Sequence, residues 1–168
     1  MQKGDFNAMI TSACFSPCRK YRYSLIREWG GLFSNNLSIM FIGLNPSTAD
    51  ATLDDPTIRR EINFAKAWGY SGLYKVNLFG YRSTDPKKLK DVEDPIGPEN
   101  DDYIINIGKS NKVGRIVAAW GTLGTFKNRD KTVKAFFDEI YHLGLTKDGH
   151  PKHPLYLSKN TQLERWSI

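Results

Sequence analysis

LSIMFIGLNPSTAD, residues 37–50, is the stretch around which the chain is organised. It begins as an apolar run and stops abruptly at the turn residues GLNPS, numbers 43–47. A short apolar run bounded by turn residues is typical of a buried, parallel strand. In open α/β sheets, ligands bind at the carboxyl ends of the strands. We therefore take this turn as the candidate active site.

Length and composition are those of one globular domain. The chain has 168 residues, of which 40% are hydrophobic and 25% charged, enough for a single core. We expect one domain over residues 1–168, with the weakly patterned residues 1–17 as a loose arm. No apolar run approaches the length of a membrane span, and no secretory signal stands out. The expectation is a cytoplasmic monomer without membrane contact.

The net charge of +6 is unevenly distributed. Residues 1–108 hold 13 basic and 13 acidic side chains, whereas residues 109–168 hold 11 and 5, so the whole excess is C-terminal. A basic half-surface attracts polyanions, and DNA is the partner that it suggests. On charge alone, a merely soluble basic surface is an equally good interpretation.

Helices and strands alternate after the turn. Asp55 and Pro56 are a good cap and first residue of a helix that Gly69 can end. This helix presents one apolar stripe, made of Ile58, Ile62, Ala65 and Trp68. Further patterns predict strands over 73–79 and 115–119, and helices over 100–110 and 132–143.

The alternation predicts a three-layer α/β/α sandwich around a four-stranded, mainly parallel sheet. The fourth strand lies either within 142–146 or at 155–158. Residues 19–29 alternate as a strand, which we expect to be half of an N-terminal hairpin closing near Gly30 and Gly31. Its basic residues could touch a phosphate backbone, but an edge strand with a charged solvent face is the favoured interpretation.

Three polar turns should meet at one edge of this sheet: 43–50, 77–86 and 120–125. Asn45 offers donors and an acceptor, so it can hold a water molecule or read a base. Asn77 is a polar amide in an apolar strand, and such an amide either ties down the core or points into a pocket. Arg82 follows the same strand and could reach an anionic group.

Common nucleotide and metal motifs are absent from the sequence. It has no GxGxxG after the first strand and no Walker-type lysine. Asp50, Asp54 and Asp55 could suggest magnesium, but Asp55 is explained as a helix cap. Cys14 and Cys18 are too few to close a zinc site and are expected to be reduced thiols. We expect no metal and no cofactor.

Four segments resemble the uracil-DNA glycosylase superfamily. Residues 43–47, GLNPS, resemble its first active-site motif, nearest the mismatch-specific branch, in which an Asn stands at this position. Residues 153–158, HPLYLS, resemble the second motif. Between them, VNL at 76–78 is similar to the strand whose Asn reads the flipped uracil, and AWG at 119–121 to a strand ending in Trp-Gly. The resemblance implies a uracil-DNA glycosylase-like fold.

A role for each matching residue follows from this resemblance. Asn45 would orient the attacking water, Asn77 would hydrogen-bond the base, and His153 would stabilise charge on the departing base. Base or substrate contacts are implied for the residues of the turns: Gly43, Leu44, Pro46, Ser47, Phe79, Arg82 and Trp120. DNA contacts are implied for residues in and beside the second motif: Lys152, Leu157, Ser158 and Lys159. Leu157 would be the wedge that replaces the flipped nucleotide.

A second resemblance spans nearly the whole chain. GLNPSTAD, DDPTIRR, WGYSGL, VNLFGYRSTDP and HPLYL resemble an uncharacterised bacterial and phage domain of unknown function, which brings no activity with it. The leading hypothesis is an enzyme: a DNA glycosylase-like hydrolase that cleaves the N-glycosidic bond of uracil, mismatched thymine or a modified pyrimidine. The alternatives are a hydrolase or transferase of free nucleotides or nucleosides, and a non-catalytic nucleic-acid-binding module.

Overall fold

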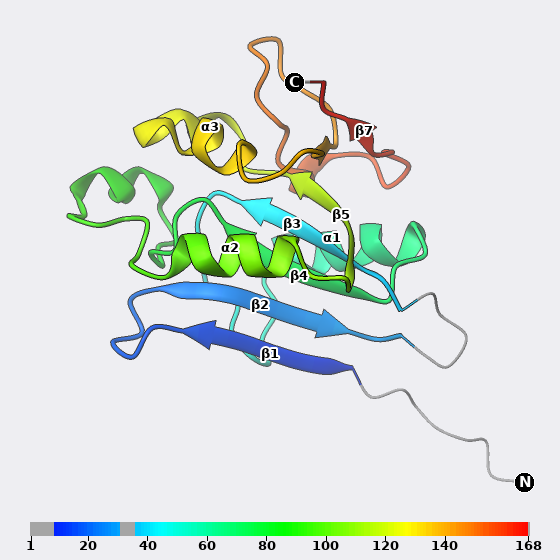
Figure 1. Cartoon of the computed structure of the whole chain (residues 1–168), viewed down its shortest axis with the longest axis horizontal. Helices are drawn as coiled ribbons and strands as arrows, with labels where there is room; N and C mark the ends of the chain where they lie inside the picture. The colour runs from blue at the N-terminus through cyan, green and yellow to red at the C-terminus, as the bar shows by residue number, and fades with distance from the viewer. Residues whose placement is uncertain (1–8, 31–35, 168) are drawn as a thin grey trace, which may run out of the picture.

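A computed structural model describes residues 9–30 and 36–167 (Figure 1). These residues form an α/β fold around one mixed seven-stranded sheet, with strand order β1-β2-β4-β3-β5-β6-β7. The strands are β1 (Ile10–Phe15), β2 (Arg22–Glu28), β3 (Ser38–Gly43), β4 (Gly72–Asn77), β5 (Val113–Ala118), β6 (Tyr141–His142) and β7 (Glu164–Arg165). The helices are α1 (Pro56–Ala67), α2 (Asn100–Gly108) and α3 (Arg129–Lys134), with 3₁₀ turns η1 (Pro86–Asp91), η2 (Thr122–Asn128) and η3 (Pro154–Tyr156).

The predicted central strand is confirmed as β3. Every residue of β3 is buried, and the strand pairs in parallel with β4 on one side and β5 on the other. β6 extends this parallel part beside β5, whereas β1, β2 and β7 pair antiparallel. The predicted α/β class is confirmed, but the sheet is larger than four strands, because antiparallel strands extend it at both edges.

Helices cover both faces of the sheet. α1 packs its apolar stripe on the face formed by Ile39, Phe41 and Leu73. α2 and α3 cover the opposite face, where Met40, Ile42 and Val76 lie with residues of both helices in one cluster. Because side chains alternate along a strand, the continuous apolar run of β3 serves both cores.

The start of α1 is built as the sequence predicts. The Oδ1 atom of Asp55 accepts a hydrogen bond from the Ile58 main-chain N–H at 2.9 Å, and Pro56 is the first helical residue. The helix ends at Ala67, and Gly69 follows with φ of +82°, a conformation that favours glycine. This capping fixes the first turn of α1 beside the end of β3.

The N-terminal segment differs from the prediction. β2 pairs with β1, which precedes it, so the hairpin turns within residues 16–21; Gly31 lies outside the described residues. Residues 10–15 are therefore a strand and not a loose arm. β2 is also not an edge strand, because β4 pairs with its other side. Its Arg22 and Arg27 are only 2% and 0% exposed, so these charges face the interior, where main-chain carbonyl groups accept their hydrogen bonds.

The C-terminal segment also differs. The predicted helix over 132–143 was wrong beyond Lys134, because the chain straightens and Tyr141–His142 pairs with β5. Ile140 and Leu143 would share one face of a helix, but in the extended chain they lie in the cores on opposite sides of the sheet. The fourth parallel strand therefore lies at 141–142, close to the first of the two predicted places, and 154–156 is a 3₁₀ turn.

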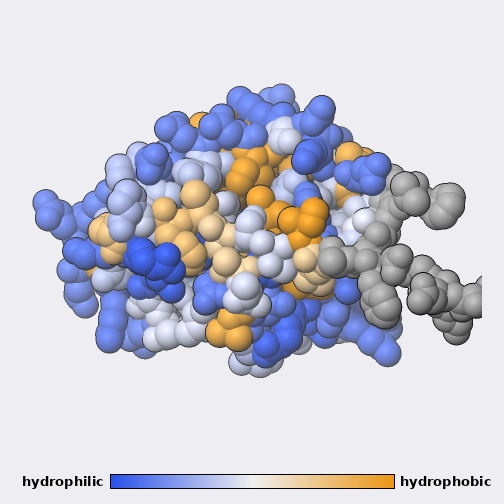
Figure 2. Space-filling model, turned by 90° about the horizontal axis from the view of Figure 1, so that it is seen from below, coloured by the Kyte–Doolittle hydropathy of each residue, from blue (hydrophilic) through white to orange (hydrophobic). Residues whose placement is uncertain are grey.

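β1 forms one edge of the sheet. Its residues ITSACF carry no charge, and Figure 2, seen from that side, shows apolar side chains gathered among polar ones.

Of the helices in the described part, none combines the length and the apolar character that crossing a membrane requires.

Candidate functional site

The three polar turns meet in one pocket of about 190 Å³ at the carboxyl ends of β3 and β4. We call it the Asn45 pocket. It is lined by Arg22, Gly43, Leu44, Asn45, Ser47, Asp55, Thr57, Ile58, Lys75, Asn77, Ser83, Thr84, Pro86, Trp120 and His153. Four segments far apart in the sequence thus supply Asn45, Asn77, Trp120 and His153 to the same space.

Asn45 is held by its own turn and by the turn after β4. Its Nδ2 donates hydrogen bonds to the main-chain oxygens of Pro46 at 3.0 Å and Ser83 at 2.8 Å. The Ser83 N–H in turn donates to the Pro46 oxygen at 2.9 Å. Because carbonyl oxygens can only accept, the side-chain atom that contacts both of them must be the amide nitrogen. The other side-chain atom, Oδ1, is then the acceptor that Asn45 can offer to a ligand or a water molecule.

Asn77, the last residue of β4, is 2% exposed. Its Nδ2 is buried and makes no hydrogen bond within the described part of the chain. The main chain around it is fixed, because Asn100 Nδ2 donates to the oxygens of Asn77 and Leu78 at 3.0 and 3.1 Å. A buried donor without a partner is costly. Since Asn77 lines the pocket, the pocket interpretation of this residue has direct geometric support.

A buried ion pair lies next to Asn77. Lys75 Nζ and Glu61 Oε1 are 2.5 Å apart, and these two residues are 5% and 0% exposed. Burial raises the pKa of Glu61, and the adjacent Lys75 ammonium opposes that shift. The sequence reasoning missed both residues. The signal was present: Lys75 interrupts an apolar strand two residues before Asn77, and Glu61 stands on the inner stripe of α1 between Ile58 and Ala65.

Arg22 and Asp55 add charge to the pocket wall. Arg22 Nη1 donates to the Ala49 main-chain oxygen at 2.7 Å, which ties β2 to the turn after β3. Burial lowers the pKa of Arg22 to about 10, partly offset by Asp55 and Glu61. The guanidinium therefore stays charged at neutral pH.

His153 reaches the pocket through the loop after β6. The Gly121 N–H donates to the Pro151 oxygen at 3.0 Å, which joins this loop to the turn after β5. His153 keeps an exposed surface at the rim. Loss of water around the ring, and then the Lys75 ammonium, lower its pKa to about 4. Its Nδ1 accepts from the Leu155 N–H at 3.3 Å, so the neutral ring carries its proton on Nε2.

Three expected substrate contacts, Pro46, Phe79 and Arg82, do not line the pocket. Phe79 is fully buried and packs on Phe126, with ring centroids 5.5 Å apart, in the core beneath α2. Arg82 turns toward the β1–β2 hairpin, where it donates to the Arg19 oxygen and lies over the Phe15 ring. Residues 83, 84 and 86 of the same segment do line the pocket, but the Phe79 ring is turned into the core and the Arg82 guanidinium toward the hairpin.

The residues implied in DNA contact lie outside the pocket. Leu157 packs against the α1-side core, and its oxygen accepts from Arg60 Nη2. Ser158 Oγ accepts from the Asn160 N–H at 3.2 Å. Lys152 and Lys159 are exposed. Pro46 contributes its main-chain oxygen to the Asn45 and Ser83 hydrogen bonds.

The aspartates of the first turn are used structurally. Asp50 Oδ1 accepts from the main-chain N–H groups of Thr52 and Leu53 at 2.9 and 2.7 Å, and these bonds lower its pKa. Asp54 pairs with Arg27 Nε at 2.8 Å. Among the described residues, no group of three or more His, Cys, Asp or Glu side chains is placed to hold a metal ion.

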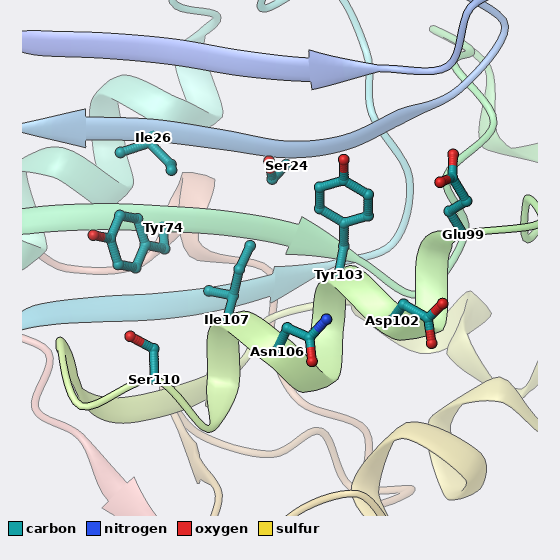
Figure 3. Close-up of a pocket in the computed structure, with 9 residues that line it drawn as sticks. All are labelled: Ser24, Ile26, Tyr74, Glu99, Asp102, Tyr103, Asn106, Ile107 and Ser110. Carbon is teal, nitrogen blue, oxygen red and sulfur yellow. The ribbon is translucent and has the colours of Figure 1, made fainter.

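A second, larger hollow of about 570 Å³ lies between α2 and strands β2 and β4 (Figure 3). None of the predicted site residues lines it. Its two tyrosines already have partners: Tyr74 donates to Glu28 Oε1 at 2.5 Å, and the Tyr103 hydroxyl lies 2.8 Å from Cys14 Sγ. The Asn45 pocket is smaller, but it is lined by Asn77, whose Nδ2 has no partner in the described part of the chain, and by Lys75 of the buried ion pair, so it is the better candidate for chemistry.

A family model described as "Protein of unknown function (DUF1643)" matches residues 22–155. This span runs from β2 to η3 and includes every residue that lines the Asn45 pocket. No curated protein and no solved structure gives a significant match.

Proposed function

The chain belongs to the DUF1643 family, and we propose that it is a DNA glycosylase-like hydrolase that cleaves the N-glycosidic bond of uracil, mismatched thymine or a modified pyrimidine. The observation that carries the proposal is that Asn45, Asn77, Trp120 and His153 line one pocket. These are the residues to which the resemblance to the uracil-DNA glycosylase superfamily gives roles. The parallel order β4-β3-β5-β6, with helices on both faces, also suits a relative of that superfamily.

The size of the pocket favours a single ring. At about 190 Å³ it is smaller than the roughly 300–1,000 Å³ of typical ligand pockets. A pyrimidine ring can enter while its sugar and phosphate stay outside. This is the arrangement needed by an enzyme that draws a base out of a DNA strand.

In the proposed reaction, Asn45 orients the attacking water. Its Nδ2 is occupied by two carbonyl oxygens, so Oδ1 accepts a hydrogen bond from the water. The water oxygen adds to C1′ of the sugar, and the C1′–N bond breaks with its electron pair going to the base. An amide is a weak proton acceptor. The proton released by the water therefore ends on the departing base, and the reaction is expected to be slow.

His153 and Asn77 serve the departing base. With its pKa lowered to about 4, His153 is neutral at pH 7 and donates a hydrogen bond from Nε2 to the charge that develops on the base. Asn77 supplies the buried Nδ2 donor, which has no other partner among the described residues. Both groups gain a bond when the base is bound.

An abasic-site assay tests the proposal. Wild type and Asn45→Ala are incubated with single-stranded and duplex oligonucleotides that carry uracil, thymine opposite guanine, or modified pyrimidines, and alkali then cuts any abasic strand. We expect cut strands with wild type and at least tenfold fewer with Asn45→Ala. No cut strand from any substrate, or equal cutting by the variant, contradicts the proposal. Base release from free nucleosides but not from oligonucleotides would favour an enzyme of free nucleosides.

A further inference from the structure

Lys75 has a place in the Asn45 pocket that the proposed reaction does not use. It comes from the centre of β4 and is 5% exposed, and Glu61 of α1 stands behind it at 2.5 Å. Lys75 lines the pocket, whereas Glu61 does not. A buried ion pair is weak evidence for stability, since well-packed apolar residues often serve as well. Its position at a pocket suggests a binding role.

Gly43 brings Lys75 and Asn77 together. A Cβ atom at residue 43 would lie 2.7 Å from Lys75 Nζ and 2.7 Å from Asn77 Oδ1. The ammonium and the amide therefore both lie over the bare Cα of Gly43. Lys75 and Asn77 are two residues apart on β4, so they also share one face of the sheet. Together with Gly43, they form the floor of the pocket.

The floor presents several hydrogen-bond donors beside the acceptor Asn77 Oδ1, with little net charge. An ammonium has three donors, and Glu61 Oε1 uses one of those of Lys75. Asn77 Nδ2 is a further donor without a partner in the described residues. The Glu61 carboxylate offsets the Lys75 charge. Arg22 and Asp55, which carry opposite charges, both line the pocket as well. Such a floor suits neutral carbonyl oxygens better than an anionic group.

We propose that Lys75 determines specificity by donating a hydrogen bond to an oxo oxygen of the bound base, beside the group held by Asn77. The ligand class is an oxo pyrimidine such as uracil, thymine or a modified form. Where uracil turns an oxo oxygen toward Lys75 Nζ, cytosine would turn its amino group, and a donor left facing a donor is strongly disfavoured. This inference rests on the proposed function for the entry of a base into the pocket, but not on hydrolysis.

The test measures binding, so it does not depend on catalysis. The probes are two fluorescent single-stranded oligonucleotides of one sequence, with uracil or cytosine at a single position. The main variant is Lys75→Met with Glu61→Gln, because Lys75→Met alone would leave a buried carboxylate without its partner. Lys109→Met, an exposed lysine at the end of α2, is the matched control. Thermal unfolding of each variant checks that it is folded.

Wild type and Lys109→Met are expected to bind the uracil strand at least tenfold more tightly than the cytosine strand, and the double variant to lose most of that difference. Equal binding of both strands by wild type overturns the inference. So does an undiminished preference in the folded double variant. If the double variant does not fold, Lys75→Met with Glu61→Leu is measured instead, because this change replaces the whole ion pair by apolar side chains, and an undiminished preference in that variant overturns the inference. A uracil preference that depends on Lys75 without any base release would sustain the inference while the proposed hydrolase fails.

Discussion

Adding one methyl group at Gly43 should disable the pocket without unfolding the protein. The Cβ of Gly43→Ala would lie 2.7 Å from both Lys75 Nζ and Asn77 Oδ1, and 2.9 Å from Lys75 Cε. Ordinary contact begins at about 3.4 Å, so the two polar atoms must each retreat by about 0.7 Å. Gly43 has no positive φ, so alanine can adopt its backbone conformation.

The expected effect is large on function and small on stability. The displaced atoms are the ends of flexible side chains, so the free energy of unfolding should change by less than about 1 kcal/mol. A misplacement near 1 Å at a reacting or binding group can cost about 100-fold in rate. We therefore expect base release and uracil-strand binding to fall about 10- to 100-fold in Gly43→Ala.

The two properties are measured on the same preparation. Urea unfolding gives the stability, and strand cutting and oligonucleotide binding give the function. Gly114→Ala is the matched control, because it lies on an exposed part of β5 and the atoms nearest to its Cβ belong to the Tyr70 and Leu37 side chains, at 3.1 Å or more. A folded Gly43→Ala protein that keeps full activity and binding would refute the placement of the floor in the functional site.

Three further predictions concern folding and pH. Arg27→Met should lower the free energy of unfolding by about 3–5 kcal/mol in urea titrations, because Asp54 and several main-chain oxygens lose a fully buried partner; a loss below 1 kcal/mol would contradict this. Asn100→Ala removes the side-chain donor of the Asn77 oxygen and one of the two donors of the Leu78 oxygen, which keeps Arg129 Nε, so we expect a loss of about 1–3 kcal/mol and reduced oligonucleotide binding; unaltered chemical denaturation would count against it. The folded-state pKa of His153, about 4, lies below the usual 6.5, so between these values the unfolded chain binds the proton and stability should fall as pH falls. The rate of base release should therefore show no change near pH 6.5 that is due to His153. A step near pH 6.5 in the pH–rate profile of wild type that is missing from His153→Asn would contradict the lowered pKa of His153.

The sequence predicts the parts of the site that local patterns determine. The apolar run before Gly43 predicts a buried strand, and the Asp55 cap predicts that α1 begins after the turn. The rule that ligands bind at the carboxyl ends of parallel strands then brought Asn45 and Asn77 to one edge. These inferences needed only spacing and residue type, and the structure places both side chains in one pocket.

The rest depends on tertiary contacts that spacing does not encode. A lysine in a strand ordinarily marks a solvent face, and only packing against α1 shows that Lys75 is buried with Glu61. Likewise, β2 has the alternation of an edge strand, but its arginines face inward because main-chain oxygens satisfy them. Ile140 and Leu143 have helical spacing, but residues 141–142 between them pair with β5 and form a strand.

Mass-spectrometric detection of the free base tests the proposed function most directly. One oligonucleotide with a single uracil is incubated with wild type, Asn45→Ala and Lys109→Met, and released uracil is counted against the strand that lost it. Wild type and Lys109→Met should release one uracil for each abasic strand, and Asn45→Ala should release at least tenfold less. Uracil release that is absent from wild type, or unchanged in Asn45→Ala, would contradict a glycosidic hydrolase in the Asn45 pocket.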